Sequence, residues 1–319
     1  METSEFDFID TCVDLEGKVF YYFRDKFALD ILKWHVGHGK TMAEIKKSHV
    51  AGLLEKPAVK NITKHAGNGQ IRAALFDNYW PVEIFGFRLS IGKWVGKWKT
   101  RRDNFRQTSR SGINLVLRLD FGKKHDREYQ RLIMPAVPEA EIFERSCHPI
   151  NPCAKTLAWA RIDIDMDNGE ALIEEIQNDW IRIADRVYKT VAEQCVKREK
   201  ERSNFVFFKQ SNASFSKLSA YYTQVLAPYR PIWDEAMMHA AVSFLRNELG
   251  INRIFYHTWE TGNALKKLRN GYQPPISLYT KLPRKFGFKP TENSPKMLSE
   301  VMKTLRLNGE VYEWFLLEV

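Results

Sequence analysis

The sequence has 319 residues, of which 44% are hydrophobic, 13% aromatic and 28% charged, and this composition excludes a disordered chain. Four cysteines exclude a disulfide scaffold, and no apolar run reaches the roughly 18–20 residues of a membrane helix. The acidic N-terminus lacks an apolar signal core, so we expect a cytoplasmic protein with no membrane partner.

A formal net charge of +10 at pH 7 attracts anions. Nucleic acid, a phosphate-bearing cofactor and an acidic protein are therefore candidate partners. A basic surface that serves only solubility is the alternative.

Residues 1–65 are predicted to be mostly helical. Apolar side chains recur at spacings of three and four over residues 20–34, which is the pattern of a helix with one buried face. A second helix is predicted over residues 41–54. A short third helix follows Pro57, because proline fits the first helical turn.

Residues 71–135 change to a pattern of strands and turns, with strands predicted at 82–91 and 113–121. We place a domain boundary near residue 150, so that a helical and then β-rich basic region at 1–150 precedes a second domain at 151–319. The connector before this boundary is punctuated by prolines: Pro135, Pro138, Pro149 and Pro152.

The second domain begins with two alternating apolar runs, at 157–166 and 171–179, separated by Asp167-Asn168-Gly169. Asn-Gly between two such runs is the strongest short-range signal of a β-hairpin. Residues 181–203 are predicted to form a charged surface helix within a segment, about 181–231, that is inserted into the domain.

The clearest helix covers residues 233–250, since its apolar stripe has helical spacing, acids stand in its first turn and a glycine ends it. A strand is predicted at 251–258, a short helix at 261–269 and a last strand at 311–319. Strand, helix and strand in this order imply a crossover between parallel strands. The predicted fold class is α/β of the α+β kind, with a mixed central sheet flanked by helices.

The order of elements from residue 157 onward resembles the GNAT superfamily of acyl-CoA-dependent N-acyltransferases. In that family a hairpin leads into a central strand, a long helix, a strand and a short helix, and a Leu-Tyr…Gly-Phe segment precedes the last strands. Here Asn263-Ala264-Leu265 stands at the short helix, and Leu278-Tyr279 through Gly287-Phe288 stands at that segment. The spacing is longer than usual because residues 282–285 intervene.

The GNAT resemblance implies an acyl-CoA cofactor and a role for Tyr279 in protonating the departing thiolate, with a plain core tyrosine as the alternative. The family's Gly-rich turn, which holds the cofactor pyrophosphate at a helix N-terminus, is absent from this sequence. Residues 212–216 and Tyr229-Arg230-Pro231 are candidate substitutes for it. Arg230 and, from its place in the resemblance, Asn263 are therefore candidate cofactor-binding residues.

A second resemblance is local. Residues 175–180, Glu-Ile-Gln-Asn-Asp-Trp, resemble the Glu-Ile-Gln-Ser-Asp-Trp motif of a domain in large phage-encoded polyvalent proteins. That domain also has a Trp-led helix, a Thr-x-x-Thr-Gly stretch and a Tyr-x-x-Leu-Pro segment, which here begin at Trp233, Thr258 and Tyr279. The resemblance implies a phage or anti-phage origin.

Alternation along the strand at 171–179 places Glu175, Gln177 and Asp179 on one face, with Glu174 pointing the other way. Clustered carboxylates have shifted proton affinities, so Glu175 or Asp179 is a candidate general base and Gln177 a candidate substrate-orienting residue. An edge strand with solvated side chains is the alternative.

His257 ends the next strand, followed by Glu260 and Thr261, at the carboxyl edge where α/β sheets place ligands. His257 is therefore a candidate catalytic residue. A structural histidine that is satisfied by its neighbours is the alternative.

Basic residues and two tryptophans crowd into residues 93–110, and only Asp103 opposes them. Such a cluster can neutralise phosphates while its indoles stack on bases, whereas the alternative is a hairpin with a solvated basic tip. The candidate nucleic-acid-binding residues are Lys93, Trp94, Lys97, Trp98, Lys99, Arg101, Arg102, Arg106 and Arg110.

Two other patterns are rejected. Gly39-Lys40-Thr41 is not a P-loop, because Trp34 stands where that motif needs glycine and no strand precedes it. Cys147-His148 with Cys153 lacks a second ligand pair, so no metal site is predicted.

The sequence therefore supports two hypotheses of function. The first is a GNAT-like transferase, with acyl-CoA as its cofactor, that modifies a nucleic acid or an associated amine. The second is a non-catalytic protein on the same fold that binds nucleic acid or inhibits a host.

Overall fold

A computed structural model of the chain shows a mixed α/β protein of the α+β kind, which confirms the predicted fold class. The structure describes residues 1–64, 69–77, 79–95, 107–133, 143–144, 148–197, 215–268, 274–306 and 312–318.

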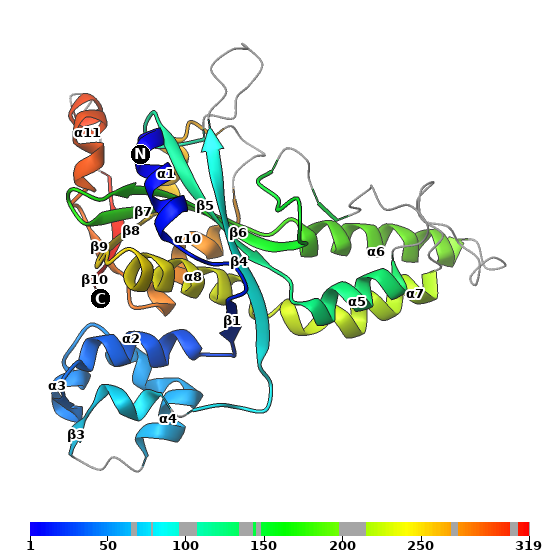
Figure 1. Cartoon of the computed structure of the whole chain (residues 1–319), viewed down its shortest axis with the longest axis horizontal. Helices are drawn as coiled ribbons and strands as arrows, with labels where there is room; N and C mark the ends of the chain where they lie inside the picture. Colours follow the sequence, from blue (N-terminus) through cyan, green and yellow to red (C-terminus); the bar gives the residue numbers. More distant parts are fainter. Residues whose placement is uncertain are drawn as a thin grey trace.

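A mixed sheet runs through the centre of the molecule (Figure 1). Its strands, in spatial order, are β1 (Val19–Tyr22), β4 (Phe85–Val95), β5 (Ile113–Asp120), β6 (Thr156–Asp165), β7 (Glu170–Gln177), β8 (Arg253–His257), β10 (Trp314–Glu318) and β9 (Lys289–Thr291). Neighbouring strands are antiparallel except β7 and β8, which are parallel. A two-stranded sheet pairs β2 (Lys40–Thr41) with β3 (Gln70–Ile71).

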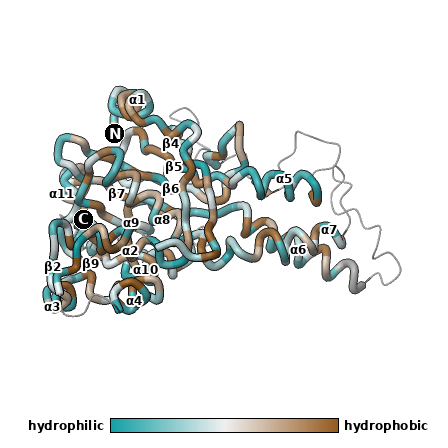
Figure 2. The backbone as a smooth tube through the Cα atoms, turned by 60° about the horizontal axis from the view of Figure 1, so that its bottom comes forward, coloured by the Kyte–Doolittle hydropathy of each residue, from teal (hydrophilic) through white to brown (hydrophobic). Residues whose placement is uncertain are grey.

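The helices fall into three groups. One group, α2 to α4, forms a small lobe at one end of the sheet, and a second, α5 to α7, extends away from the other end as an arm (Figures 1 and 2). The remaining helices lie close to the sheet. The helix bounds are α1 (Thr3–Cys12), α2 (Lys26–Val36), α3 (Met42–Lys46), α4 (Pro57–Thr63), α5 (Lys123–Leu132), α6 (Trp180–Lys197), α7 (Phe215–Ala220), α8 (Trp233–Ser243), α9 (Trp259–Leu265), α10 (Ile276–Lys285) and α11 (Ser299–Arg306).

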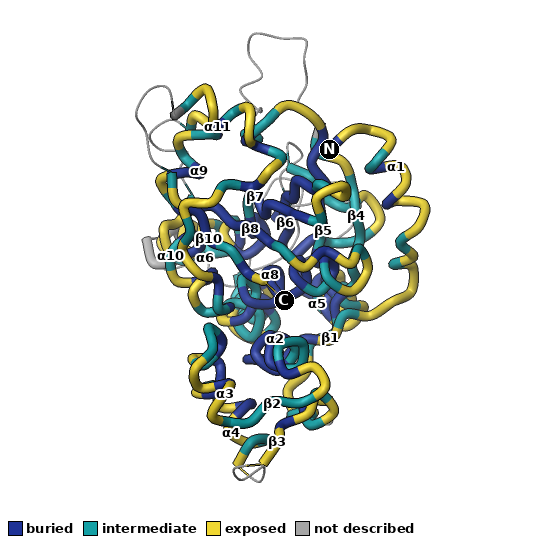
Figure 3. Tube along the Cα trace, turned by 90° about the vertical axis from the view of Figure 1, so that its left-hand side faces the viewer, coloured by how far each residue is buried: buried dark blue, intermediate teal, exposed yellow. Residues whose placement is uncertain are grey.

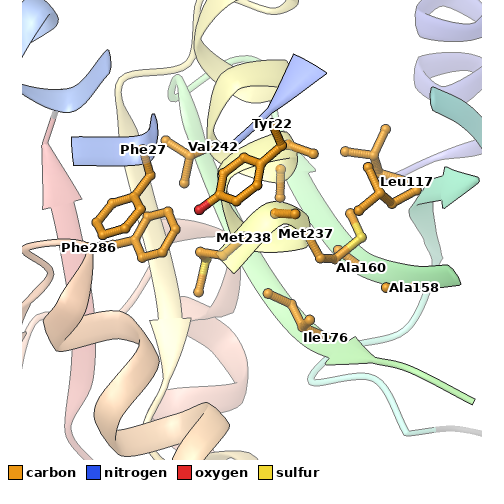
Figure 4. Close-up of a cluster of buried hydrophobic side chains, with 14 of the residues drawn as sticks. Tyr22, Phe27, Leu117, Ala158, Ala160, Ile176, Met237, Met238, Val242 and Phe286 are labelled. Atoms are coloured by element: carbon orange, nitrogen blue, oxygen red, sulfur yellow. The ribbon is translucent and has the colours of Figure 1, made fainter. Parts of the chain in front are cut away.

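The sheet separates two hydrophobic cores, and its central strands are buried (Figure 3). The larger core lies under α8, whose Met237 and Met238 pack beside Leu117 and Ala160 of the sheet (Figure 4). The smaller core lies on the opposite face, under α11. Its buried members are Leu172, Phe255, Leu298, Met302 and Trp314.

The predicted helix over residues 20–34 is wrong at its start. Residues 19–22 form β1 and pair with β4, and the helix begins only at Lys26. Asp25 adopts a left-handed backbone conformation (φ 67°), which separates the strand from the helix. Both elements bury apolar side chains, so periodicity alone did not distinguish a short strand from the first helical turn.

The other N-terminal elements are close to their predicted positions. The helix expected over 41–54 is split into α3 and a 3₁₀ turn at Ala51–Glu55, and Pro57 occupies the first turn of α4 as predicted. The expected strands at 82–91 and 113–121 are β4 and β5. The boundary near residue 150 stays a prediction. The strands on its two sides, β5 and β6, pair within one sheet.

The second half follows its predicted order. The β6–β7 hairpin, the long helix α8 and the parallel pairing of β7 with β8 are all confirmed. The helix continues beyond Ser243 as a π-helical turn to Glu248, and Gly250 has the expected positive φ of 68°. The charged helix expected over 181–203 corresponds to α6, whose described part ends at Lys197.

Replacing Gly169 with alanine is expected to destabilise the fold by about 1–2 kcal/mol, because this turn residue has φ +61° while an added Cβ would meet no other atom. Urea unfolding of Gly169→Ala beside Gly52→Ala would measure this cost. Gly52 also has open space but no positive φ, so the second variant should keep its stability. Equal stability of the two variants would contradict the expectation.

Candidate active site at the carboxyl ends of β7 and β8

The candidate site lies where the parallel strands separate. Pairing between β7 and β8 ends at Ile173 and Tyr256, although β7 continues to Gln177. Lys266, directly after α9, donates a hydrogen bond from its ammonium to the carbonyl oxygen of Glu174, 2.7 Å away, and so satisfies one backbone group beyond the last pair. Ligands of α/β proteins bind at such carboxyl ends.

A β-bulge at Glu174 changes the face that each β7 side chain occupies. Ile173 is opposite Ile162 and Glu175 is opposite Arg161, so Glu174 is an extra residue in the ladder. The simple alternation expected here is therefore wrong for Glu174. Its carboxylate meets His257 on the side of the smaller core, whereas Ile176 lies in the larger core.

Glu174, His257 and Ser109 form a closed triangle of hydrogen bonds. Nε2 of His257 lies 2.9 Å from Oε2 of Glu174 and 2.9 Å from the hydroxyl of Ser109. The Ser109 hydroxyl and backbone N–H both donate to the carboxylate, each at 2.9 Å. A nucleophilic relay would need both ring nitrogens of the histidine, but here one nitrogen makes both contacts and all three residues are buried. The triangle is therefore a structural element.

The ionisation of this triangle is fixed by its contacts. Burial alone would raise the pKa of Glu174, but its hydrogen bond and charge interaction with His257 and the nearby Lys266 and Arg161 lower it to about 2. Burial lowers the pKa of His257 below its ordinary value, because the charged ring loses its water. Glu174 is therefore ionised at neutral pH.

His148, Asp179 and Gln177 form a second cluster at the end of β7, and this cluster is partly exposed. Nδ1 of His148 is hydrogen-bonded to Oδ2 of Asp179, and the Gln177 amide donates to Oδ1 of Asp179 at 3.0 Å. The exposed fractions are 14% for the His148 side chain and 7% for Asp179. The imidazole also packs edge-on against Trp159, with ring centroids 5.7 Å apart.

Asp179 is held ionised. Burial would raise its pKa, but the hydrogen bond and charge of His148, together with Arg182 and Gln177, lower it to about 2. Because its partner is this carboxylate, Nδ1 of His148 donates the hydrogen bond, which leaves Nε2 for other partners. Among the described residues, nothing hydrogen-bonds Nε2 of His148.

Glu175 is not free. Its carboxylate accepts a hydrogen bond from Nη2 of Arg161 at 3.0 Å, and the guanidinium also lies 4.8 Å from the ring centre of Trp94. Nε and Nη1 of Arg161 are buried without a hydrogen-bond partner among the described residues. Glu175 therefore neutralises a buried arginine, which competes with a role as general base.

Tyr279 lies in α10 on the other side of Lys266. The Lys266 ammonium is 5.4 Å from its ring centre, and its ring is 5.3 Å from that of Tyr256. The hydroxyl is buried and has no hydrogen-bond partner among the described residues. Burial, with smaller contributions from Tyr256 and Glu175, raises the pKa of Tyr279 well above its ordinary value, so it stays protonated at neutral pH.

Comparison of the chain with protein-family models, with curated proteins and with solved structures found no match.

The residues present do not fit an acyl-CoA pyrophosphate at the start of α6. Only Asn178 and Asp179 separate β7 from this helix. The Asn178 side chain caps the helix by accepting a hydrogen bond from the N–H of Ile181 at 2.8 Å, and the Asp179 carboxylate lies next to this cap in the sequence. The first turn of α8 likewise contains Asp234 and Glu235. Carboxylates thus stand where a bound phosphate would need positive charge.

The two candidate cofactor residues have different surroundings. Arg230 packs over the ring of Tyr222 at 3.8 Å and donates to Asp185, so it holds the arm together. Asn263 lies in α9, with its Nδ2 buried and unpartnered among the described residues. Residues 212–214 of the other candidate segment lie outside the described ranges.

The candidate nucleic-acid-binding cluster is described only at its ends. Lys93 forms an ion pair with Asp7 of α1 at 2.6 Å, and Arg110 donates to the buried Asp163 at 2.6 Å. Trp94 stacks on Trp159, with ring centroids 6.0 Å apart. The other members lie outside the described ranges: Lys97, Trp98, Lys99, Arg101, Arg102 and Arg106.

Two further results concern the described residues alone. They contain no group of three His, Cys, Asp or Glu side chains that could hold a metal ion, and Cys147 lies outside them. Every helix among them is too short or too polar to span a lipid bilayer.

The structure adds four residues to those selected from the sequence: His148, Ser109, Arg161 and Lys266. His148 reaches Asp179 across 31 positions, and Ser109 reaches His257 across 148. Residues so far apart in the sequence form no short motif, so the sequence alone does not reveal these contacts. In the sequence, His148 belongs only to the rejected metal-site pattern of Cys147-His148 with Cys153.

Proposed function

We propose that this protein is a transferase in which His148 acts as general base on the nucleophile, an amine of a nucleic acid or of a molecule bound to it. The His148–Asp179 pair carries the proposal. Asp179 fixes the ring through Nδ1, so Nε2 can accept the proton that the amine loses when it attacks. Gln177 donates a hydrogen bond to the Asp179 carboxylate and so helps to fix the orientation of the His148 ring.

The order of elements also supports a GNAT-like transferase. A hairpin, a central strand, helices, one parallel strand and Tyr279 before the last strands follow one another as in that family. Tyr279 stands where that family places its proton donor, and its protonated hydroxyl has no hydrogen-bond partner among the described residues.

The donor in this proposal is an acyl thioester that is not anchored through a pyrophosphate, because carboxylates stand at the starts of α6 and α8. We therefore expect acetyl-CoA and acetyl-pantetheine, which lacks the nucleotide, to be used with similar kcat/KM. A strong preference for acetyl-CoA would contradict this expectation.

The experiment is a thiol-release assay with both thioesters, with a DNA oligonucleotide or spermidine as the amine acceptor. Mass spectrometry would identify the acylated acceptor. Thiol release that depends on the acceptor and on His148 would support the proposal. Release no faster than without protein, for every donor and acceptor tested, would refute it.

A further inference from the structure

The outward faces of helices α5 and α6 are both basic. The two helices contain eight lysine and arginine residues against four aspartate and glutamate residues, an excess of four within a chain whose net charge is +10. Both helices belong to the arm that extends from the sheet (Figure 1), and α5 is largely hydrophilic (Figure 2).

Apolar residues of both helices enter one buried aromatic cluster. His125 and Tyr129 of α5 lie 5.7 and 5.0 Å, between ring centroids, from Trp180 of α6. The Trp180 indole donates to the Tyr221 hydroxyl at 2.7 Å, and His125 bonds the same hydroxyl at 2.8 Å. Because this buried aromatic cluster joins the inner faces, the charged residues of both helices are directed outward.

The acids of these helices are mostly neutralised by partners. Asp126 pairs with Arg88 of β4 at 2.6 Å, and Asp185 pairs with Arg230 at 3.3 Å. Glu128 pairs with Arg131 of its own helix at 2.6 Å. Glu193 is the remaining acid, so these carboxylates offset little of the outward positive charge.

Five exposed basic residues have no ion pair with any residue that the structure describes: Lys123, Lys124, Arg127, Arg186 and Lys189. Lys123 and Arg127 are four residues apart, and Arg186 and Lys189 are three apart, so each pair lies along one helix face. None of the exposed large apolar side chains in the described ranges belongs to α5 or α6. The outward faces of α5 and α6 therefore offer positive charge without an aromatic platform on which single-stranded bases could stack.

We infer that the outward faces of α5 and α6 bind the phosphate backbone of a double-stranded nucleic acid. Lysine and arginine side chains that neutralise phosphates release counterions, which supplies affinity without sequence preference. The inference rests on the proposed function in one respect, since the bound duplex would bring the acceptor amine to His148. The binding itself does not require catalysis.

Fluorescence anisotropy with a short labelled duplex, over roughly 50 to 200 mM salt, tests the inference. Each phosphate contact contributes about 0.9 to the slope of log K against log salt, so Lys123→Ala/Arg127→Ala and Arg186→Ala/Lys189→Ala should each lower the slope by about 2. Lys46→Ala/Lys47→Ala is the matched control, because both lysines are exposed in and beside α3 of the other lobe. Its slope should equal that of the unmodified protein.

Similar binding of DNA and RNA duplexes would support backbone contact. Slopes of the arm variants equal to that of the control, affinity that does not change with salt, or tighter binding of a single strand would overturn the inference. His148→Asn should bind the duplex normally. Loss of acyl transfer by His148→Asn with intact duplex binding would therefore bear only on the catalytic role of His148. Loss of salt-dependent binding by the α5 and α6 variants would bear only on the basic faces of these helices.

Discussion

Replacing His148 with asparagine is expected to lower kcat/KM for amine acylation by about 10²–10⁴-fold, which is the usual contribution of a positioned general base. Asparagine retains a side-chain N–H that can donate to Asp179 but has no ring nitrogen that can accept the proton from the amine. The thiol-release assay gives kcat and KM separately. His38, an exposed histidine of the small lobe, provides the matched control His38→Asn, which should keep full activity.

A second variant separates the roles of His148 and Asp179. Asp179→Asn should lower kcat more than it raises KM, since Asp179 positions the ring and does not touch the acceptor. A His148→Asn variant with an unchanged kcat/KM would remove His148 from the proposed mechanism.

Replacing Glu174 with alanine is expected to destabilise the fold by about 3–5 kcal/mol, because it removes one partner from a fully buried, charged hydrogen-bonded cluster. Glu174→Gln keeps the shape and one acceptor oxygen, so its loss should be smaller, about 1–3 kcal/mol. Urea unfolding at neutral pH measures both. Glu300→Ala, at an exposed position of α11, is the control and should cost little. An Ala variant at 174 as stable as this control would contradict the account of the triangle.

The same cluster predicts a loss of stability in acid. Glu174 has a lowered pKa in the folded protein, so its stabilising contribution is complete above the unfolded value and is lost as pH falls from about 4.5 toward 2. His257 also has a lowered pKa, so the unfolded chain takes up its proton first and stability declines below about 6.5. Unfolding free energies measured from pH 7 down to about pH 3 should therefore decrease, and by less in Glu174→Gln.

The part of the fold that could be predicted from the sequence has strong local signals. Asn168-Gly169 marked the β6–β7 hairpin, and the long helix before β8 required a parallel crossover. β1 was missed because Phe20 and Tyr22 also fit the start of a helix. Only pairing with β4, more than sixty positions away along the chain, decides in favour of a strand.

The candidate site could be predicted only in part, for a geometric reason. The sequence selected Asp179, Gln177 and His257, and the structure places them at the carboxyl ends of β7 and β8. It also divides them between a buried structural triangle and a partly exposed pair. The bulge at Glu174 and the long-range partner His148 cause this division, and neither has a signature in the spacing of residues along the chain.

The parallel pairing of β7 with β8 has a consequence for how the protein folds. The antiparallel strands from β4 to β7 are neighbours in sequence order, whereas Glu170 meets Arg253 only after a loop of more than eighty residues has closed. Closing a long loop costs entropy before any contact is gained, so contacts of this kind form slowly. We therefore expect the meander to form early and β8 to dock late, so that the triangle of Glu174, Ser109 and His257 is completed in one of the last steps of folding.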